Sequence, residues 1–416
     1  MNILDDLEFR GLTYQVTDRD GLAERLASGP ITLYNGFDPT SDSMTVGNLV
    51  TILLLRRFQL AGHRAIALIG GGTGLIGDPG GKRDERSLNP EEVVRGWVEL
   101  FKRQLEPYLD FTGGANPARL VDNYDWLGQV RAIELLRNVG KHFPVPYMLA
   151  KDSVAARLET GISYTEFSYM ILQSYDFLQL NEAYGCELQT GGSDQWGNIT
   201  AGVDLIRRAT GRRAFGLTCP LVTKADGAKF GKSEGGAVWL DAAKTTPYQF
   251  YQFWVNAEDQ KVGEYLRFYT FLDRAAILDL DEAVRSRPDQ REAQRTLADE
   301  VTTLVHGAEA TRRAERISRA LFYGDFRDLT EEEIREGFHD VPTCRLEGTE
   351  SSLIDLLVAS GASPSKRQAR QDVQSGAVYL NGERCADLER VVRRQDGLHG
   401  RYHILRRGKK SYYLVD

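Results

Sequence analysis

The chain has 416 residues, enough for two or three domains with a sizeable core. Hydrophobic residues make up 42% and charged residues 27%, which excludes a disordered chain, a collagen-like repeat and a small disulfide-stapled domain. The four cysteines have no Cys-x-x-Cys spacing, which argues against a zinc ribbon and for a reducing compartment. The opening residues contain no apolar run and no later run could span a membrane, so we expect a cytoplasmic protein without a secretory signal.

Charge is divided unevenly along the chain. The formal net charge is −7, which by itself argues against a nucleic-acid partner. Residues 351–416 contain 12 Lys and Arg against 7 Asp and Glu, a net of +5, so the remaining 350 residues carry −12. A basic tail on an acidic body suggests that an appended module handles a polyanion. Chance segregation with a solvated basic surface is the alternative.

The N-terminal half alternates short apolar runs with longer segments of helical periodicity. Buried strands are predicted at residues 31–37, 65–71, 187–192 and 215–222. Helices are predicted at 46–61, after the first strand, and at 197–209, between the last two. This alternation indicates an α/β fold, a parallel Rossmann-type sheet covered by helices. Residues 91–186 have mostly helical patterns, so we expect an insertion and crossover helices there.

After Gly235 the pattern is helical up to about residue 337, with no convincing strand. The short polar segment that follows contains Pro and Gly and is predicted to be a linker. The last 66 residues indicate two short helices and then strands. The expected parts are a Rossmann-type domain at 1–222, a lysine-containing loop with a helical domain at 223–338, the linker at 339–350, and a small α+β domain at 351–416.

A glycine-rich turn follows the second predicted strand, and residues 72–77 fit the Gly-x-Gly-x-x-Gly spacing of dinucleotide-binding proteins. That pattern needs a helix that begins at once, whereas Asp78 is followed by proline here, so we do not expect NAD binding. The turn lets backbone N–H groups approach a phosphate or a flat substrate, with Lys82 and Arg86 just beyond it. Tight packing at a strand end is the alternative.

A second glycine-containing segment, residues 222–236, holds three lysines directly after a predicted strand. A flexible cationic loop at the carboxyl end of a parallel strand is well placed to close over a polyphosphate. A solvated surface loop is the alternative. Residues 34–48 add hydroxyl and amide side chains at a helix N-terminus, where they serve as ordinary caps or as phosphate donors.

Polar side chains also occur among apolar neighbours further along. Residues 191–198 form a polar turn after a strand, which suits a ligand rim or a simple capped turn. Tyr169, Gln173 and Asp176 are four and three residues apart and therefore share one helix face. That face is either a solvated stripe or a substrate wall.

Taken in order, these segments resemble the bacterial tyrosyl-tRNA synthetases, which are dimeric class I aminoacyl-tRNA synthetases. The resemblance rests on LYNGFDPTSDS, ALIGGGTGLIGDP, NYDW, GISYTEFSYMILQSYDF, GGSDQWGNI and TKADGAKFGKSEGG. It continues in the tail, where SPSKRQARQ and GAVYLNGE look like the small RNA-binding fold called S4. It covers nearly the whole chain, and several motifs in order are far more specific than any one of them.

The resemblance implies roles for the polar residues. Tyr34 and Asp176 match positions that hydrogen-bond the substrate phenol, and Gln195 lines the same pocket. The α-ammonium group is assigned to Asp78, Tyr169 and Gln173. The ATP and adenylate contacts are assigned to Gly36, Asp38, Gly47, Asn48, Gly192, Asp194 and Lys232. The phosphate end, where charge grows as pyrophosphate leaves, is assigned to Thr40, Thr45, Lys82, Arg86, Lys229, Lys232 and Ser233.

The implied reaction needs no general base. The tyrosine carboxylate attacks the α-phosphorus of ATP in line, pyrophosphate leaves, and the terminal ribose hydroxyl of tRNA(Tyr) then attacks the adenylate. Mg²⁺ is implied on the phosphates, without a dedicated protein site. Residues 229–233 match the family's mobile Lys-Met-Ser-Lys-Ser loop, with Phe and Gly in place of Met and the first Ser.

One departure concerns the family signature His-Ile-Gly-His, which reads Thr-Val-Gly-Asn at residues 45–48. Asn48 keeps a donor of similar reach, whereas Thr45 loses the imidazole donor. A lost transition-state hydrogen bond costs about 2–4 kcal/mol, so the enzyme is expected to be slow or adapted at this point. A catalytically impaired paralogue that only binds structured RNA is one alternative, and a ligase for tryptophan is another.

The resemblance implies that the tail binds the tRNA, often with the tRNA bound across the two subunits of a homodimer. Its basic residues next to predicted helices and strands suit phosphate contacts on folded RNA. The expected tRNA contacts are Lys366, Arg367, Arg370, Arg406, Arg407, Lys409 and Lys410. Residues 141–151 are apolar enough for a dimer interface or for core.

Overall fold

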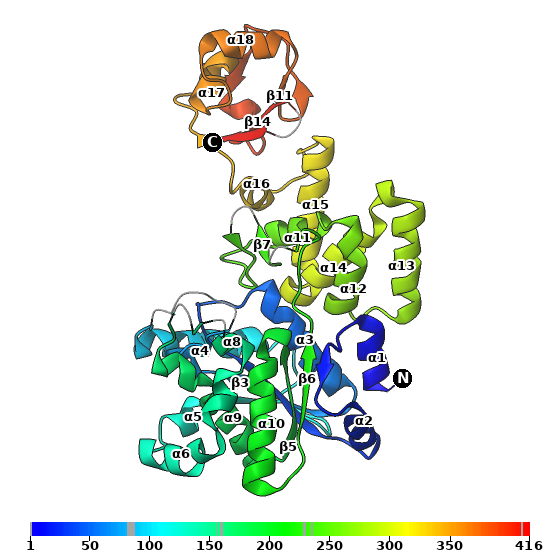
Figure 1. Ribbon diagram of the computed structural model, residues 1–416. Helices are drawn as coiled ribbons and strands as arrows, with labels where there is room; N and C mark the ends of the chain where they lie inside the picture. Colours follow the sequence, from blue (N-terminus) through cyan, green and yellow to red (C-terminus); the bar gives the residue numbers. More distant parts are fainter. Residues whose placement is uncertain are drawn as a thin grey trace. The chain divides into compact units, whose positions relative to one another are not determined.

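The computed structural model describes residues 2–80, 88–155, 157–158, 161–227, 230–233, 236–408 and 411–416 (Figure 1). These residues form two compact units. The first comprises Met1–Lys244 and Ala257–Leu297, and the second comprises Thr245–Asn256 and Ala298–Asp416. Within the described ranges, no helix combines the length and the apolar character that crossing a membrane requires.

A six-stranded sheet forms the centre of the first unit. Its strands are β1 (Gln15–Val16), β2 (Thr32–Phe37), β3 (Arg64–Ile69), β4 (Arg119–Asp122), β5 (Cys186–Gly192) and β6 (Phe215–Cys219). They lie in the order β1-β6-β5-β2-β3-β4, and all neighbours are parallel except β1 and β6. The two-residue strands β7 (Lys232–Ser233) and β8 (Gly236–Ala237) pair separately.

The strand order reverses between β2 and β5. From β2 the chain proceeds through β3 to β4 on one side, and from β5 to β6 on the other. Right-handed crossovers in opposite directions place helices on opposite faces of the sheet. In such sheets the crevice for ligands lies beyond the carboxyl ends of the two strands at the reversal. The fold therefore locates a ligand site beside the ends of β2 and β5.

The helices of this unit connect the strands and cover the sheet. They are α1 (Ile3–Arg10), α2 (Arg19–Ala27), α3 (Val46–Leu60), α4 (Glu91–Leu105), α5 (Tyr124–Leu127), α6 (Ala132–Asn138), α7 (Val145–Leu149), α8 (Asp152–Ala155), α9 (Tyr164–Tyr184), α10 (Trp196–Thr210), α12 (Asp259–Tyr269) and α13 (Arg274–Ser286). Figure 1 shows α9 and α10 side by side over one face. Tyr34 and Ile66 of the sheet pack there against Phe177 and Leu205.

The second unit combines helices with a five-stranded sheet. The helices are α11 (Pro247–Val255), α15 (Ala308–Tyr323), α16 (Glu331–Gly337), α17 (Leu353–Ala359) and α18 (Lys366–Gln374), while α14 (Glu292–His306) begins in the first unit. The sheet has the order β12-β11-β14-β15-β9. Its strands are β9 (Thr343–Cys344), β11 (Val378–Leu380), β12 (Glu383–Arg384), β14 (His403–Arg407) and β15 (Ser411–Val415), and β10 (Glu350–Ser352) pairs with β13 (Val391–Arg393).

This second sheet contributes to two hydrophobic cores. Ile404 of β14 packs with Ile317 of α15 and Phe338, which follows α16. The next residue, Leu405, packs with the core of α17 and α18. Successive side chains of a strand point to opposite faces, so one face of the sheet covers each pair of helices.

The predicted α/β class and its main elements are confirmed, since all four predicted strands are present within three residues at each end. Residues 91–186 differ from the expected helical segment, because β4 lies inside it and extends the parallel sheet beside β3. Four residues at a sheet edge leave no periodic signal long enough to read. Within the predicted linker, β9 pairs with β15. The domain boundaries stay a prediction.

Candidate active site

Two buried side chains occupy the predicted phenol position. Tyr34 of β2 and Asp176 of α9 are each only 1% exposed, and the Tyr34 ring lies 5.3 Å from that of Phe177. The Tyr34 hydroxyl has no hydrogen-bond partner among the described residues. Burial, and then the charge of Asp176, raises the pKa of Tyr34. Buried hydroxyls are rarely left unpaired, so this group is available to a ligand oxygen.

Asp176 is held by two donors that the sequence reasoning did not assign to the site. Asn123 donates from Nδ2 to Asp176 Oδ2 at 2.9 Å, and Trp126 donates from Nε1 to Oδ1 at 2.7 Å. Burial raises the pKa of Asp176 to about 8, although both hydrogen bonds favour the charged form. Both donors belong to the NYDW segment, whose residue types alone do not indicate that they bind a carboxylate on α9.

Asn123 also connects Asp176 to a second carboxylate. The Gly72 N–H donates to Asn123 Oδ1 at 2.7 Å, which fixes the orientation of the amide. Asn123 Nδ2 therefore donates to Thr73 Oγ1 at 2.9 Å, and Thr73 donates to Asp38 Oδ1 at 2.7 Å. A hydrogen-bonded chain thus joins Asp176 to Asp38 through residues from the ends of three neighbouring strands.

The predicted ammonium site brings carboxylates and amides together. Tyr169 donates its hydroxyl to Asp38 Oδ2 at 2.6 Å, and Gln195 donates from Nε2 to Asp78 Oδ2 at 2.7 Å. Burial raises the pKa of Tyr169, and the charges of Asp38 and Asp78 raise it further. The Oε1 atom of Gln173 is buried without a described hydrogen-bond partner. Two carboxylates and an unpaired amide oxygen suit a cationic group.

Glycines allow the backbone to pass close to these carboxylates. A Cβ atom at Gly70 would lie 1.9 Å from Asp38 Oδ1, and one at Gly192 would lie 2.6 Å from Asp194 Oδ1. Asp194 is exposed just beyond the end of β5, and Gly36 is exposed near the end of β2. Within the ranges that the structure describes, no three His, Cys, Asp or Glu side chains are arranged to hold a metal.

Thr45 and Asn48 form a pair at the N-terminus of α3. Asn48 Oδ1 accepts from the Thr45 backbone N–H at 3.0 Å and from its hydroxyl at 3.1 Å. A backbone N–H can only donate, so the oxygen of the amide must face it. Asn48 Nδ2, the donor of the amide, therefore points away from Thr45. Thr40 and Gly47, which are close to this pair in the sequence, are exposed.

The base of the lysine loop pairs with the segment that precedes α3. The Val46 N–H donates to the Val238 carbonyl at 3.1 Å, and the Leu240 N–H donates to the Met44 carbonyl at 2.9 Å. A Cβ atom at Gly231 would lie 3.0 Å from the Val46 side chain. Gly231 of the loop and the residues that directly follow the loop therefore lie beside the signature residues.

The charged residues of the lysine loop are described only in part. The Phe230 ring packs against the Tyr265 ring at a tilt of 43°, with ring centroids 4.5 Å apart, which anchors the loop to α12. Lys232 and Ser233 lie in β7. The other predicted phosphate contacts, Lys82, Arg86 and Lys229, lie outside the described residues.

The predicted tRNA contacts lie in the second unit. Lys366 pairs with Asp355 at 2.6 Å, and Arg407 pairs with Asp372 at 2.9 Å, so both charges already have acidic partners. Arg406 lies over the ring of Tyr379. Arg367 and Arg370 are exposed on α18, and Lys409 and Lys410 lie outside the described residues.

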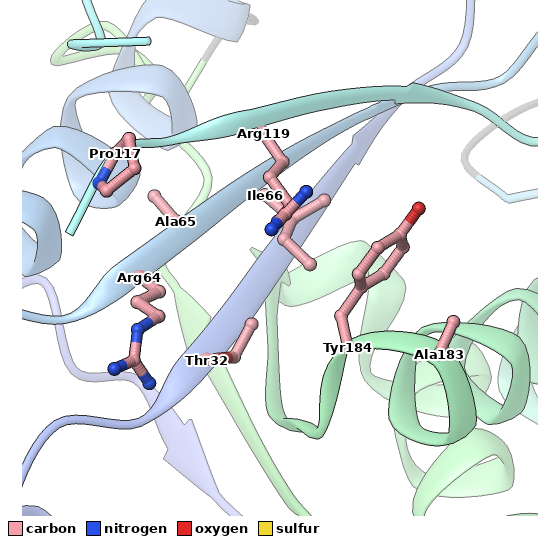
Figure 2. A pocket seen from close by; sticks show the side chains of 8 residues that line it. All are labelled: Thr32, Arg64, Ala65, Ile66, Pro117, Arg119, Ala183 and Tyr184. Carbon is pink, nitrogen blue, oxygen red and sulfur yellow. The ribbon is translucent and has the colours of Figure 1, made fainter. Parts of the chain in front are cut away.

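A separate hollow of about 240 Å³ lies at the amino ends of β2, β3 and β4, and Figure 2 shows the side chains around it. Arg119 lies there over the ring of Tyr184, at 5.1 Å from the ring centroid. The hollow is lined by Thr32, Arg64, Ala65, Ile66, Pro117, Arg119, Ala183 and Tyr184. It contains none of the predicted site residues that the structure describes, and the predicted tyrosine contacts lie instead toward the carboxyl ends of the strands.

Comparisons with known families and solved structures identify relatives of this chain. Residues 26–323 match the family described as tRNA synthetases class I (W and Y). Residues 333–415 match the tyrosine–tRNA ligase SYY-like C-terminal domain. The C-terminally truncated mitochondrial tyrosyl-tRNA synthetase of Aspergillus nidulans superposes with a TM-score of 0.70 at 29% identity, covering 77% of this chain and 94% of that one. A tryptophanyl-tRNA synthetase from Encephalitozoon cuniculi, at 14% identity and a TM-score of 0.53, shares the fold over 80% of this chain and 89% of that one.

Full-length relatives extend the likeness to the whole chain. The tyrosine–tRNA ligase of Geobacillus stearothermophilus is 58% identical over 416 residues, which span 100% of this chain and 99% of the relative. That of Desulfitobacterium hafniense is 59% identical over 418 residues, with the same coverage. With this identity over its full length, and with both domain families matched in order, the chain belongs to the bacterial tyrosine–tRNA ligases, a family of class I aminoacyl-tRNA synthetases.

Proposed function

We propose that the chain catalyses the two-step reaction of a tyrosine–tRNA ligase. It activates L-tyrosine with ATP to form tyrosyl-adenylate and pyrophosphate, and it then transfers the tyrosyl group to the 3′ end of tRNA(Tyr). One observation carries this assignment beyond the fold. The unpaired hydroxyl of Tyr34 and the carboxyl of Asp176 are both buried at the predicted phenol position.

The pair accounts for the choice of tyrosine over phenylalanine. The phenol hydroxyl of the substrate donates to Asp176, and the Tyr34 hydroxyl donates to the phenol oxygen. Phenylalanine would leave both groups buried without partners, which costs the full desolvation penalty of each. Asn123 and Trp126 hold the Asp176 carboxylate in place for this contact.

The other end of tyrosine binds where the carboxylates gather. The α-ammonium group lies among Asp78, Tyr169 and Gln173, with Gln195 positioning Asp78 through its hydrogen bond. The unpaired Oε1 atom of Gln173 is an acceptor for that ammonium group. Held in this way, the tyrosine carboxylate faces the α-phosphorus of ATP for in-line attack.

The adenylate and phosphate contacts follow the exposed strand ends and the N-terminus of α3. Gly36, Asp38, Gly47, Gly192 and Asp194 border the nucleotide, and Thr40 and Thr45 face its phosphates. Asn48 offers Nδ2 as a donor, oriented by Thr45. Charge on the departing pyrophosphate is stabilised by Lys82, Arg86, Lys229, Lys232 and Ser233, with Mg²⁺ entering on the phosphates of ATP.

We place RNA binding in the tail. Residues 351–416 form an S4-like domain, joined through the linker at 339–350 to the helical region 223–338 and the Rossmann-type domain 1–222. Arg367, Arg370 and Arg406 are its best placed tRNA contacts, since Lys366 and Arg407 are paired with acids. Their binding to phosphates weakens as the salt concentration rises.

A homodimer is the proposed assembly. Large apolar side chains are exposed along α6, α7 and the start of α9. Exposed apolar surface does not stabilise a monomer, but it does stabilise a protein–protein interface when a partner covers it. The exposed side chains are Ile133, Leu136, Val145, Leu149 and Tyr164. All four cysteines are free, which suits an enzyme that aminoacylates tRNA in the reducing cytoplasm.

Exchange of labelled pyrophosphate into ATP tests the first step. We expect exchange that depends on tyrosine and Mg²⁺ and that phenylalanine does not support. Tyr34→Phe is expected to raise the KM for tyrosine with little change in the KM for ATP, because only the phenol contact is removed. Absence of exchange from folded protein would refute the enzyme and leave an RNA-binding paralogue.

A further inference from the structure

The segment that leads into α3 is buried but belongs to no helix or strand. Strand β2 ends at Phe37 and α3 begins at Val46. Between them, Ser43 is 1% exposed and Met44 is 0% exposed. Backbone polar groups that are buried outside regular structure need partners from other parts of the chain. The partners of Met44 therefore fix where the chain enters the signature residues 45–48.

One partner is Gln104, a residue that none of the sequence motifs includes. It lies at the C-terminal end of α4, between Phe101 and Leu105, which are 2% and 0% exposed. Gln104 Oε1 accepts from the Met44 N–H at 2.8 Å, and Gln104 Nε2 donates to Ser43 Oγ at 3.0 Å. A backbone N–H can only donate, so the amide must present its oxygen to Met44 and its nitrogen to Ser43. A single side chain thus binds two consecutive residues of the segment.

The carbonyl of Met44 is held by the residues that follow the lysine loop. It accepts from the Leu240 N–H at 2.9 Å, and the next residue, Thr45, forms an antiparallel bridge with Trp239. The N–H of Met44 is therefore bound by α4, and its carbonyl is bound by the chain after the loop. Without Gln104 the buried N–H would lose its partner, and the backbone would have to shift to find another.

The position of Met44 bears directly on the Thr45–Asn48 pair. The Thr45 N–H, one residue further along, donates to Asn48 Oδ1 and so directs Asn48 Nδ2 away from Thr45. We infer that Gln104 is a positioning residue for Thr45 and Asn48 in tyrosine activation. The inference rests on the proposed function, which assigns this pair to the nucleotide and its phosphates. In this role Gln104 holds the backbone from which the two contacts are made, without contacting either substrate. A small displacement of a contacting group can slow catalysis about 10²-fold.

The test measures tyrosine-dependent pyrophosphate exchange by the full-length protein, with kcat expressed per site that forms adenylate. Gln104→Met fills a similar volume without hydrogen bonds, and Gln104→Asn keeps the amide on a shorter side chain. We expect both to lower kcat about 10-fold with an unchanged KM for tyrosine, because the proposed tyrosine contacts lie on other elements. Gln104→Glu keeps an acceptor for the Met44 N–H and should stay near wild type. Arg103→Met, at the exposed neighbouring position, is the matched control and should change nothing.

A double-mutant cycle tests whether Gln104 acts through Asn48. In an Asn48→Ala background, Gln104→Met should lower kcat much less than in the wild type, because the group that it positions is already gone. An unchanged kcat in Gln104→Met and Gln104→Asn, with only the melting temperature lowered, would overturn the inference, as would fully additive losses in the cycle. Absence of exchange from the folded wild type would instead refute the proposed function itself.

Discussion

Burial and hydrogen bonding have opposite effects on the pKa of Asp176. Its donors Asn123 and Trp126 favour the carboxylate, but burial dominates and raises the pKa to about 8. The folded protein therefore binds a proton that the unfolded chain releases near pH 3.8. By linkage, the contribution of Asp176 to stability falls as pH rises from about 4 to about 8.

This shift predicts a pH dependence of tyrosine binding. Only the ionised carboxyl of Asp176 accepts from the substrate phenol, so binding at lower pH must first displace a proton. We expect the Kd for tyrosine, measured by equilibrium dialysis, to fall about 10-fold or more between pH 6.5 and 8 and to level off about one pH unit above the pKa of Asp176. Asp176→Asn should bind weakly with no such slope. A pH-independent Kd in the wild type would contradict the proposed role.

The Thr45–Asn48 pair predicts unequal effects of its two members. Asn48→Ala should slow pyrophosphate exchange about 10²–10³-fold, because a donor that faces the nucleotide is lost. Thr45→His should speed exchange, since it restores an imidazole donor near the phosphates. For both variants the measured quantity is the kcat of pyrophosphate exchange, and the Kd for tyrosine serves as the control. A slower Thr45→His enzyme would show that Thr45 serves mainly to orient Asn48.

At the scale of elements, two arginines converge on the C-terminal end of α12. Arg57 of α3 donates to the Thr270 carbonyl at 2.6 Å, and Arg10 of α1 donates to the same oxygen at 3.2 Å and to the Leu272 carbonyl at 2.7 Å. Burial lowers the pKa of Arg57 to about 9. The unpaired carbonyls at a helix end are thus satisfied by side chains from two other helices.

We expect Arg57→Leu to destabilise the protein by about 2–4 kcal/mol, because carbonyls that are buried would lose charged donors. Its neighbour Arg56 contacts only the Phe271 ring among these groups, so Arg56→Leu is the matched control and should cost about 1 kcal/mol or less. Thermal unfolding measures both variants. Equal losses would show that α3 is sensitive to any change here.

The sequence predicted elements with long, regular patterns and missed the short ones. The periodicity of α3 and the apolar run of β2 stand out because many residues repeat one environment. The edge strands β1 and β4 have two and four residues, too few for a period to appear. Their strand state comes from pairing with β6 and β3, which the local sequence does not encode.

At the scale of the whole molecule, the basic tail also covers apolar side chains of the helices that precede it. Tyr402, Ile404 and Leu414 of the tail pack with Ile317 and Phe338 in one core. Removing residues 351–416 therefore takes away the proposed RNA contacts and exposes apolar side chains of the helices. The proposed tyrosine site lies within the first unit, which has a core of its own.

We expect the truncated protein to lose aminoacylation but to retain pyrophosphate exchange, and to aggregate more readily than the full chain. Aminoacylation, exchange and light scattering on the same preparation measure the three effects. Loss of exchange as well would contradict the separation of chemistry from RNA binding proposed here. Full-length protein with Arg367→Gln and Arg370→Gln is the control, because it removes exposed charges while leaving the core intact.

The sequence by itself determined the α/β class, the basic tail on an acidic body, and the family, because strand–helix periodicity, charge counts and ordered motifs are all local properties. It also pointed to Tyr34 and Asp176. Only the tertiary structure decided that Asn123 and Thr73 join Asp176 to Asp38, and that burial raises the pKa of Asp176 to about 8. The hydrogen-bonded pairs are 35 to 53 residues apart in the chain. Asp38, Thr73 and Asn123 meet because parallel strands bring their carboxyl ends to one edge of the sheet, and Asp176 of α9 reaches Asn123 there.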